Sequence, residues 1–271
     1  MRLATILGTI QSTFTKFPYL RKVWQRNTEE ERLLGVSLTG IYDNPLLTKQ
    51  GDNLNAILSE LREMARTTNT EWAAKLGVPT SAAITCVKPS GTVSQLVDSA
   101  SGIHPRHSKY YVRRVRGDKK DPLTQFLIEQ GVPYEACVYK PDQTIVFSFP
   151  QKAPAGITRA DVTPQSHLAL WLTYQRHWCE HKPSVTISVE EKDWPSVGAW
   201  TWENFDEISG VSYLPYDGGT YRQAPYEECT EEEYKELKAK QPQINWEAFI
   251  ENTDNVEGAQ MLACSSGSCE I

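Results

Sequence analysis

The sequence is short of the features that mark membrane proteins and disulfide-rich proteins. No apolar run approaches the roughly 18–20 residues that a membrane-spanning helix needs, and residues 1–4 do not begin a secretory signal. Six cysteines scattered over 271 residues do not make a disulfide framework. We therefore expect a globular cytoplasmic protein with no membrane partner, in which Cys86, Cys137, Cys179 and Cys229 are reduced.

The sequence also lacks a Walker phosphate-binding loop and a strongly basic composition. Without the G-x-x-x-x-G-K-[ST] spacing, no nucleoside-triphosphatase is indicated. The net charge of −6 argues against a nucleic-acid partner, although residues 109–120 hold six basic side chains. Strand alternation places Arg114 and Arg116 on one face and Arg113 on the other. We interpret this segment as a solvated strand edge and expect no nucleic-acid partner.

From residue 28 onward, short β-branched runs alternate with helical patterns. This alternation is typical of βα units around a mostly parallel sheet, so we expect an α/β fold. Residues 28–31 (Thr-Glu-Glu-Glu) fit a helix capping box, and Asp121-Pro122 fits a helix start. The patterns predict helices from Leu54 to a stop at Gly77, from 122 towards Gly131, and over 168–179. They predict strands at 34–41, 82–87, 110–115, 144–149, 185–189 and, as the last strand, 211–214.

The first residues form an apolar helical stripe without a preceding cap. Leu3, Ile6, Leu7 and Ile10 recur at helical spacing from the very start of the sequence. The pattern fits a chain entered in the middle of an element, which predicts a further portion upstream. An ordinary N-terminal helix fits it equally well.

Residues 88–94 (Lys-Pro-Ser-Gly-Thr-Val-Ser) lie between a predicted strand and the next helical segment. Gly91 lets the backbone approach a ligand closely, and successive N–H groups in such a turn can converge on an anion. The hydroxyls of Ser90, Thr92 and Ser94 would add donors. The segment is therefore a candidate phosphate cradle; a plain strand-to-helix turn, with these hydroxyls acting as caps, is the alternative.

Residues 177–181 (His-Trp-Cys-Glu-His) match the H-x-x-E-H pattern of inverted zinc peptidases. Two histidines four residues apart share a helix face and can chelate one metal ion. This makes a zinc-dependent hydrolase that uses His177, Glu180 and His181 an alternative function. Pro183 ends the helix directly afterwards, and no acidic helix supplies a third ligand, so we expect no metal site and interpret the motif as a helix end.

The last residues place Cys264 and Cys269 on a tail of small polar residues. Glycine and serine between the thiols allow a small ring, so a reversible disulfide is plausible, and the tail could carry a dithiol to another site. An unstructured terminus with incidental cysteines, or half of a zinc site, is the alternative. The absence of a second cysteine pair at zinc-finger spacing weakens the metal interpretation.

Taken together, several of these motifs resemble those of one enzyme family. Residues 35–40 (Gly-Val-Ser-Leu-Thr-Gly), 87–94 and 101–105 (Ser-Gly-Ile-His-Pro), followed by the Cys264/Cys269 tail, resemble class II, adenosylcobalamin-dependent ribonucleotide reductases in order and spacing. The resemblance is strongest to the monomeric ribonucleoside-triphosphate reductases. It covers essentially the whole sequence as the C-terminal part of that enzyme.

The resemblance implies a fold and a set of site residues. It implies the second half of a ten-stranded α/β barrel with surrounding helices over residues 1–226, a peripheral helical segment over 227–251 and a flexible redox tail over 252–271. Residues 89–94 would bind the phosphates of a ribonucleoside triphosphate; they are Pro89, Ser90, Gly91, Thr92, Val93 and Ser94. Cys264 and Cys269 would accept electrons from thioredoxin or a similar reductant and pass them to the active site.

One part of the family pattern is missing from this sequence. The family forms its thiyl radical on a cysteine within an Asn-Pro-Cys-Gly-Glu motif, and no cysteine here has those neighbours. We therefore predict the C-terminal segment of an adenosylcobalamin-dependent reductase that is inactive without an upstream half carrying the radical cysteine. A non-catalytic interaction domain remains a further alternative.

Overall fold

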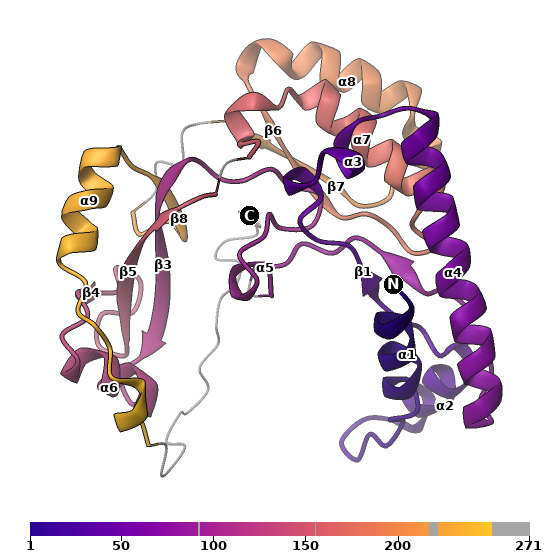
Figure 1. Cartoon of the computed structure of the whole chain (residues 1–271), viewed down its shortest axis with the longest axis horizontal. Helices are drawn as coiled ribbons and strands as arrows, with labels where there is room; N and C mark the ends of the chain where they lie inside the picture. Colours follow the sequence, from indigo (N-terminus) through magenta and orange to yellow (C-terminus); the bar gives the residue numbers. More distant parts are fainter. Residues whose placement is uncertain (92, 155, 217–221, 251–271) are drawn as a thin grey trace. The chain divides into compact units, whose positions relative to one another are not determined.

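The computed structural model describes residues 1–250 except 92, 155 and 217–221. The chain divides into two compact units (Figure 1). Unit 1 comprises Met1–Pro105 and Asp161–Pro215, and unit 2 comprises Arg106–Ala160 and Tyr216–Ile271. No helix among the described residues is long and apolar enough to cross a membrane.

Unit 1 is built mainly of helices around two short pairs of parallel strands. Strand β1 (Val36–Ser37) pairs with β2 (Thr85–Cys86), and β6 (Val185–Val189) pairs with β7 (Val211–Pro215). A parallel bridge between Val87 and Pro183 links the two pairs. The helices are α1 (Arg2–Gln11), α2 (Lys22–Glu31), α3 (Pro45–Thr48), α4 (Asp52–Leu76), α5 (Val93–Leu96), α7 (Pro164–His177) and α8 (Trp194–Glu203), and the 3-10 turns are η1 (Ile41–Asp43), η3 (Glu191–Asp193) and η4 (Phe205–Glu207).

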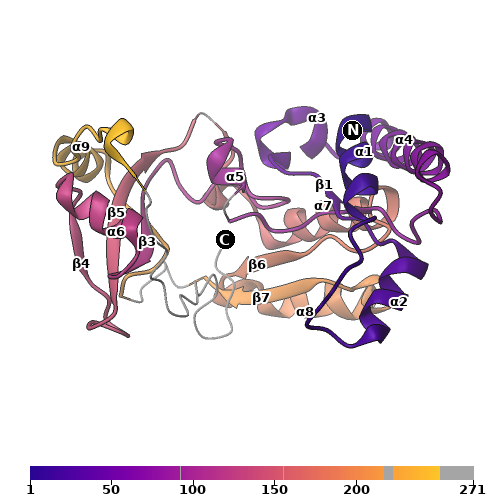
Figure 2. The same ribbon diagram turned by 90° about the horizontal axis from the view of Figure 1, so that it is seen from below.

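The core of unit 1 lies where α4 and α7 meet these strands. Trp171, Tyr174 and Trp178 are fully buried there. Each indole nitrogen donates to a backbone carbonyl, Trp171 to Pro183 at 2.6 Å and Trp178 to Cys86 at 2.7 Å. Because buried indole N–H groups need a partner, these bonds fix α7 against the strand ends. Figures 1 and 2 show α7 and α8 beside β6 and β7.

Unit 2 is a four-stranded sheet in the order β4-β5-β3-β8. Its elements are β3 (Tyr110–Asp118), α6 (Pro122–Glu129), β4 (Tyr134–Ala136), β5 (Thr144–Lys152), β8 (Tyr226–Glu228), α9 (Glu231–Ala239) and η5 (Trp246–Ala248), and η2 (Arg159–Asp161) lies at the boundary between the units. Phe126 and Leu127 of α6 pack with Ile145 and Phe147 of β5 to form a second core.

All three strand pairs of this sheet are antiparallel, whereas the sequence predicted mostly parallel strands. For the pair β4 and β5, the reason is the length of the connection. A parallel neighbour needs a crossover of about a dozen residues or more, and only residues 137–143 separate β4 from β5. The α/β class is confirmed. Among the described residues, the parallel strand pairs are β1–β2 and β6–β7 of unit 1, and unit 2 has one isolated parallel bridge, between Arg106 and Thr158.

Several element boundaries agree with the sequence-based predictions. Helix α4 ends at Gly77, which adopts φ +68° as a C-cap glycine should. Helix α6 starts after Asp121, whose side chain accepts a hydrogen bond from the Leu123 backbone at 3.0 Å. Strands β3, β5 and β6 cover the segments predicted for them. Local signals sufficed because cap chemistry and apolar periodicity pointed to the same boundaries.

Two local predictions are wrong. Thr28 does not cap a helix, because α2 already begins at Lys22; the Thr28 hydroxyl instead donates to the carbonyl of Trp24, one turn earlier, at 2.8 Å. A capping box is present in α9 instead, between Thr230 and Glu233. Strand β7 is not the last strand, since β8 follows it and pairs with residues 111–113 of β3.

Candidate functional site

The three segments that carry the family resemblance meet in unit 1. The Lys88 backbone N–H donates to the hydroxyl of Ser37 at 3.0 Å. The Gly40 N–H donates to the carbonyl of Ala100 at 2.8 Å, and the Ile41 N–H donates to the carbonyl of Gly102. Segments about 50–60 positions apart therefore hold one another in place. The candidate phosphate loop at 88–94 is therefore held by the other two segments, residues 35–40 and 101–105, which we call the loop support.

Two glycines make this close approach possible. Gly102 has φ +56°, and a β-carbon there would lie 2.9 Å from the carbonyl oxygen of Lys88. Gly40 has φ +70°, and a β-carbon there would lie 3.2 Å from Cβ of Ser99. Both the backbone conformation and the lack of space favour glycine at these positions. The start of the loop is therefore packed directly against residues 99–102.

The serines of the loop make bonds within the loop and its support. Ser90 N–H donates to the hydroxyl of Ser101 at 2.8 Å, Ser94 N–H donates to the hydroxyl of Ser90 at 3.1 Å, and the Ser94 hydroxyl donates to the carbonyl of Ser90. Ser94 is fully buried. These two hydroxyls stabilise the turn, as the capping interpretation predicted. Any ligand contact from this loop therefore falls to its backbone and its more exposed side chains.

The remaining loop residues differ in exposure. Pro89 and Gly91 are half-buried, while Val93 is 58% exposed. A β-carbon on Gly91 would meet no atom within 4 Å, so the space beside it is open. Thr92 lies outside the described residues. The structure thus leaves room for a ligand at the position where the sequence predicted close approach to an anion.

Two buried histidines anchor the support of the loop. The Thr186 N–H donates to Nε2 of His104 at 2.9 Å, so the His104 proton must be on Nδ1, which lies 3.0 Å from the carbonyl oxygen of Ser101. His167 Nε2 lies 2.8 Å from the carbonyl oxygen of Ile103 and donates to it. The two rings meet edge-on with centroids 5.9 Å apart. They join residues 101–104 to β6 and α7.

Burial keeps both rings neutral. Desolvation lowers the pKa of His104 to about 4, although the Ser101 carbonyl partly opposes it. Desolvation, followed by the neighbouring His104, lowers the pKa of His167 to about 3. The sequence motif included His104 without assigning it a role. His167 was missed, because nothing in the pattern of α7 distinguishes a histidine that bonds a distant carbonyl.

The zinc alternative is wrong for the described residues. Helix α7 ends at His177, so His181 does not share its face. His177 Nδ1 lies 3.3 Å from the hydroxyl of Ser59, and His181 Nε2 donates to the carbonyl of Leu34 at 2.7 Å. Residues 1–250, apart from the undescribed positions, contain no group of three or more His, Cys, Asp or Glu that could hold a metal ion.

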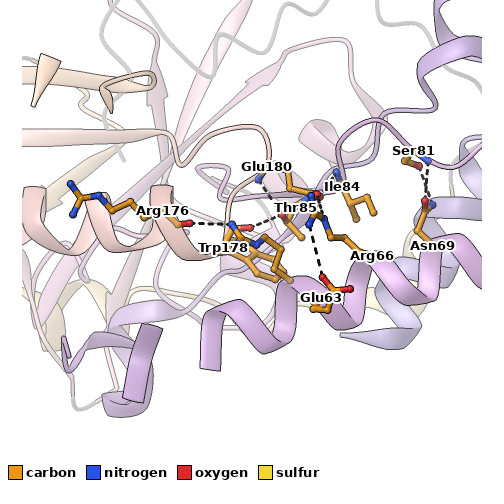
Figure 3. A network of polar contacts seen from close by, with 10 residues as sticks. Glu63, Arg66, Asn69, Ser81, Ile84, Thr85, Arg176, Trp178 and Glu180 are labelled. Atoms are coloured by element: carbon orange, nitrogen blue, oxygen red, sulfur yellow. Dashed lines mark hydrogen bonds and ion pairs between the residues drawn. The ribbon is translucent and has the colours of Figure 1, made fainter. Parts of the chain in front are cut away.

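Glu180 has a structural role instead. Its Oε1 accepts from Arg66 Nε at 2.6 Å, and its Oε2 accepts from the backbone N–H of Ile84 at 2.9 Å and of Thr85 at 3.4 Å. Figure 3 shows Glu180 beside Ile84 and Thr85, with Arg66 reaching it from α4. The carboxylate therefore joins α4 to β2 at the end of α7.

The basic strand β3 is not a solvated edge. Arg113 donates to the carbonyl of Pro225 at 3.2 Å, Arg114 to that of Ala224 at 3.3 Å, and Arg116 to that of Gln223 at 2.9 Å. These three side chains hold the segment that leads into β8. The sequence placed them on alternating faces but could not show that a segment more than a hundred positions away would meet them.

The thiols differ in their surroundings. Burial raises the pKa of Cys179 and, more weakly, that of Cys86. Burial also opposes ionisation of Cys137, but hydrogen bonds from the Tyr139 and Lys140 backbone and from Arg116 outweigh it and lower the pKa of that thiol. Cys264 and Cys269, the predicted redox pair, lie outside the described residues.

Comparison with solved structures identifies the class of fold. The chain superimposes on the crystal structure of a B12-dependent (class II) ribonucleotide reductase with a TM-score of 0.72 and 23% sequence identity, over 89% of this chain and 38% of that one. The fold is therefore that of a part of a class II ribonucleotide reductase. No family model matches the chain.

Sequence comparison finds relatives of a more specific description. The chain is 30% identical over 254 residues to the adenosylcobalamin-dependent ribonucleoside-triphosphate reductase of Euglena gracilis, covering 91% of this chain and 35% of the relative. It is 31% identical over 275 residues to a probable reductase of the same name from Dictyostelium discoideum, covering 97% and 34%. The chain is homologous to a segment of these reductases, which confirms the predicted resemblance, and it spans about a third of their length.

Proposed function

We propose that this chain is the C-terminal segment of an adenosylcobalamin-dependent ribonucleoside-triphosphate reductase and supplies the phosphate-binding loop of that enzyme. The observation that carries the proposal is the meeting of residues 35–40, 87–94 and 101–105 around one turn. Homology over 91% of the chain to an enzyme of that name supports it. The enzyme would replace the 2′-hydroxyl of a ribonucleoside triphosphate with hydrogen by thiyl-radical chemistry.

The loop would bind the triphosphate through its backbone. The space beside Gly91 admits an oxygen-rich group close to the main chain, and backbone N–H groups of a tight turn favour an anion. The bonds of Ser90 and Ser94 hold the turn in shape before the substrate arrives. The site residues proposed for the loop are Pro89, Ser90, Gly91, Thr92, Val93 and Ser94. Within this set, Ser90 and Ser94 would shape the turn, because their N–H groups already donate to the hydroxyls of Ser101 and Ser90.

Adenosylcobalamin is assigned to the whole enzyme and not to residues of this chain. The names of the relatives specify this cofactor. The histidines of the loop support do not fit it as ligands: both ring nitrogens of His104 are hydrogen-bonded, and Nε2 of His167 donates to a carbonyl. The two buried histidines are therefore not proposed as ligands of the cofactor.

The chain would contribute more to the enzyme than the phosphate loop. The segment would form the second half of a ten-stranded barrel over 1–226, with a peripheral segment over 227–251 and a redox tail over 252–271. Cys264 and Cys269 would take two electrons from thioredoxin, in the cytoplasm, and pass them to a disulfide in the upstream half by thiol–disulfide exchange. One dithiol becomes a disulfide for every disulfide that is reduced.

The proposed function is tested by an assay of CTP reduction. The chain alone, and the chain mixed with the polypeptide that carries the rest of the reductase, are incubated with adenosylcobalamin, thioredoxin and CTP. Formation of dCTP in the mixture only is the expected result. No dCTP in the mixture, with both components folded, would favour a non-catalytic interaction domain.

A matched pair of variants tests the loop itself. Gly91→Ala adds a methyl group into open space, so the Michaelis constant for CTP should change little. Gly91→Asp adds a negative charge at the same place and should raise the Michaelis constant at least about tenfold, since a tenfold change corresponds to only about 1.4 kcal/mol. An unchanged Michaelis constant in Gly91→Asp would contradict phosphate binding at this loop.

A further inference from the structure

Three large apolar side chains of α1 are exposed, whereas Ile6 is half-buried. Leu3, Leu7 and Ile10, which recur along one face of the helix, are 82%, 59% and 36% exposed. The residues of α1 that are buried are Thr5 and Thr9. The helix is therefore inverted relative to an ordinary surface helix, which buries its apolar stripe and exposes its polar face.

Polar contacts hold α1 in this orientation. The Thr9 hydroxyl donates to the carbonyl of Thr5 at 2.7 Å and accepts from the side-chain amide of Asn69, on α4, at 3.0 Å. Arg2 pairs with Glu71, two residues further along α4, at 2.9 Å. Rotating α1 to bury its leucines would leave the buried amide of Asn69 without this partner, which is costly. The orientation is thus built into the α1–α4 contact.

The segment after α1 carries further exposed apolar side chains. Phe14, Tyr19, Leu20 and Trp24 are 71%, 97%, 52% and 55% exposed, and no residue of α2 is buried. Isolated helices shorter than about 12–15 residues are marginal in water, so a ten-residue helix needs packing on another surface. We call the exposed set the N-terminal apolar surface; it consists of Leu3, Leu7, Ile10, Phe14, Tyr19, Leu20 and Trp24.

The charges around this surface indicate what covers it. The stretch of sequence from Leu3 to Trp24 also contains Lys16, Arg21 and Lys22. No Asp or Glu occurs before Glu29, although the whole chain carries a net charge of −6. A second copy of the same surface would bring like charges together, which disfavours self-association. An apolar groove edged with carboxylates would complement this surface.

We propose that the N-terminal apolar surface docks onto the portion of the reductase that lies outside this chain. The inference rests on the proposed function. The relatives contain roughly twice as much further chain as the part matched here, so that portion is large enough to provide a groove. Exposed apolar patches rimmed by charge are typical of protein interfaces. The surface is one place where the two portions of the enzyme join.

The test is the affinity of this chain for the polypeptide that carries the rest of the reductase, measured by isothermal titration calorimetry. Leu7→Glu puts a charge on the exposed stripe and should weaken binding at least about tenfold. Trp202→Ala is the matched control, because Trp202 is 83% exposed on α8, outside the surface; its affinity should be unchanged. Arg21→Glu with Lys22→Glu should also weaken binding and reduce its dependence on salt.

Three results would overturn the proposal. The first is equal affinity for Leu7→Glu and the unchanged chain. The second is a dimer of this chain by light scattering that Leu7→Glu dissociates, which would make a second copy the occupant. The third is a lower melting temperature of the Leu7→Glu variant than of the unchanged chain, both measured without a partner. That result would show that other residues of this chain cover the stripe. Binding without CTP reduction would count against the proposed function and leave the surface standing.

Discussion

At the scale of single residues, the loop support depends on a glycine that no other residue can replace without strain. Gly102→Ala should lower the free energy of unfolding by about 1–3 kcal/mol, because it combines a left-handed backbone with a contact to the Lys88 carbonyl. Gly77→Ala is the control: its φ is also positive, at +68°, but a β-carbon there meets nothing within 4 Å. Urea unfolding of both variants measures the difference, and equal losses would contradict a tight contact at Gly102.

The buried histidines predict how stability depends on pH. Both have folded pKa values, about 4 and about 3, below the ordinary value of 6.5, so the unfolded state binds more protons as the pH falls below about 6.5. The stability that the two neutral histidines contribute should therefore be fully present above pH 6.5. The free energy of unfolding should decrease as the pH falls towards 4, by up to about 1.4 kcal/mol per pH unit for each histidine. His104→Gln keeps a donor and an acceptor but does not titrate. Its plot of unfolding free energy against pH should be shallower than that of the unchanged chain, and identical slopes would refute this explanation.

At the scale of secondary-structure elements, Glu180 decides how β2 is attached to the helices. Glu180→Ala would remove the acceptor of the Ile84 and Thr85 N–H groups and the partner of Arg66, so we expect a loss of about 2–4 kcal/mol in unfolding free energy. Glu180→Gln keeps one carbonyl oxygen and should lose less. Thermal and urea unfolding measure both variants. A loss in Glu180→Gln as large as that in Glu180→Ala would show that the charge, and not the acceptor, matters most.

At the scale of the whole molecule, the tail predicts a kinetic difference between first and later turnovers. In the reconstituted enzyme, Cys264→Ser with Cys269→Ser should still form one equivalent of dCTP from a pre-reduced active site. Steady turnover with thioredoxin should then stop, because the two electrons for each cycle no longer have a carrier. Quenched-flow product analysis with dithiothreitol as an alternative reductant provides the control. Undiminished thioredoxin-driven turnover would rule out the shuttle.

Local signals in the sequence predicted much of the secondary structure. Asp121 before Pro122, Gly77 after the Leu54 stripe and the β-branched run 185–189 each marked an element correctly, because cap and periodicity effects act over a few residues. The motif at 87–94 and its relation to 101–105 were also visible, so the family could be predicted before the fold.

The tertiary structure alone decided which faces and partners those elements would have. The apolar stripe of Leu3 and Leu7 was visible in the sequence, yet α1 buries Thr5 and Thr9, and the Thr9 hydroxyl accepts a hydrogen bond from Asn69 of α4. Glu180 fits a metal-binding motif in the sequence, but in the fold its carboxylate accepts hydrogen bonds from Arg66 and from the backbone at the start of β2. A sequence fixes short-range preferences, but burial and long-range hydrogen bonding depend on contacts between residues far apart in the chain, and these decided the sheet direction, the loop support and the exposed surface.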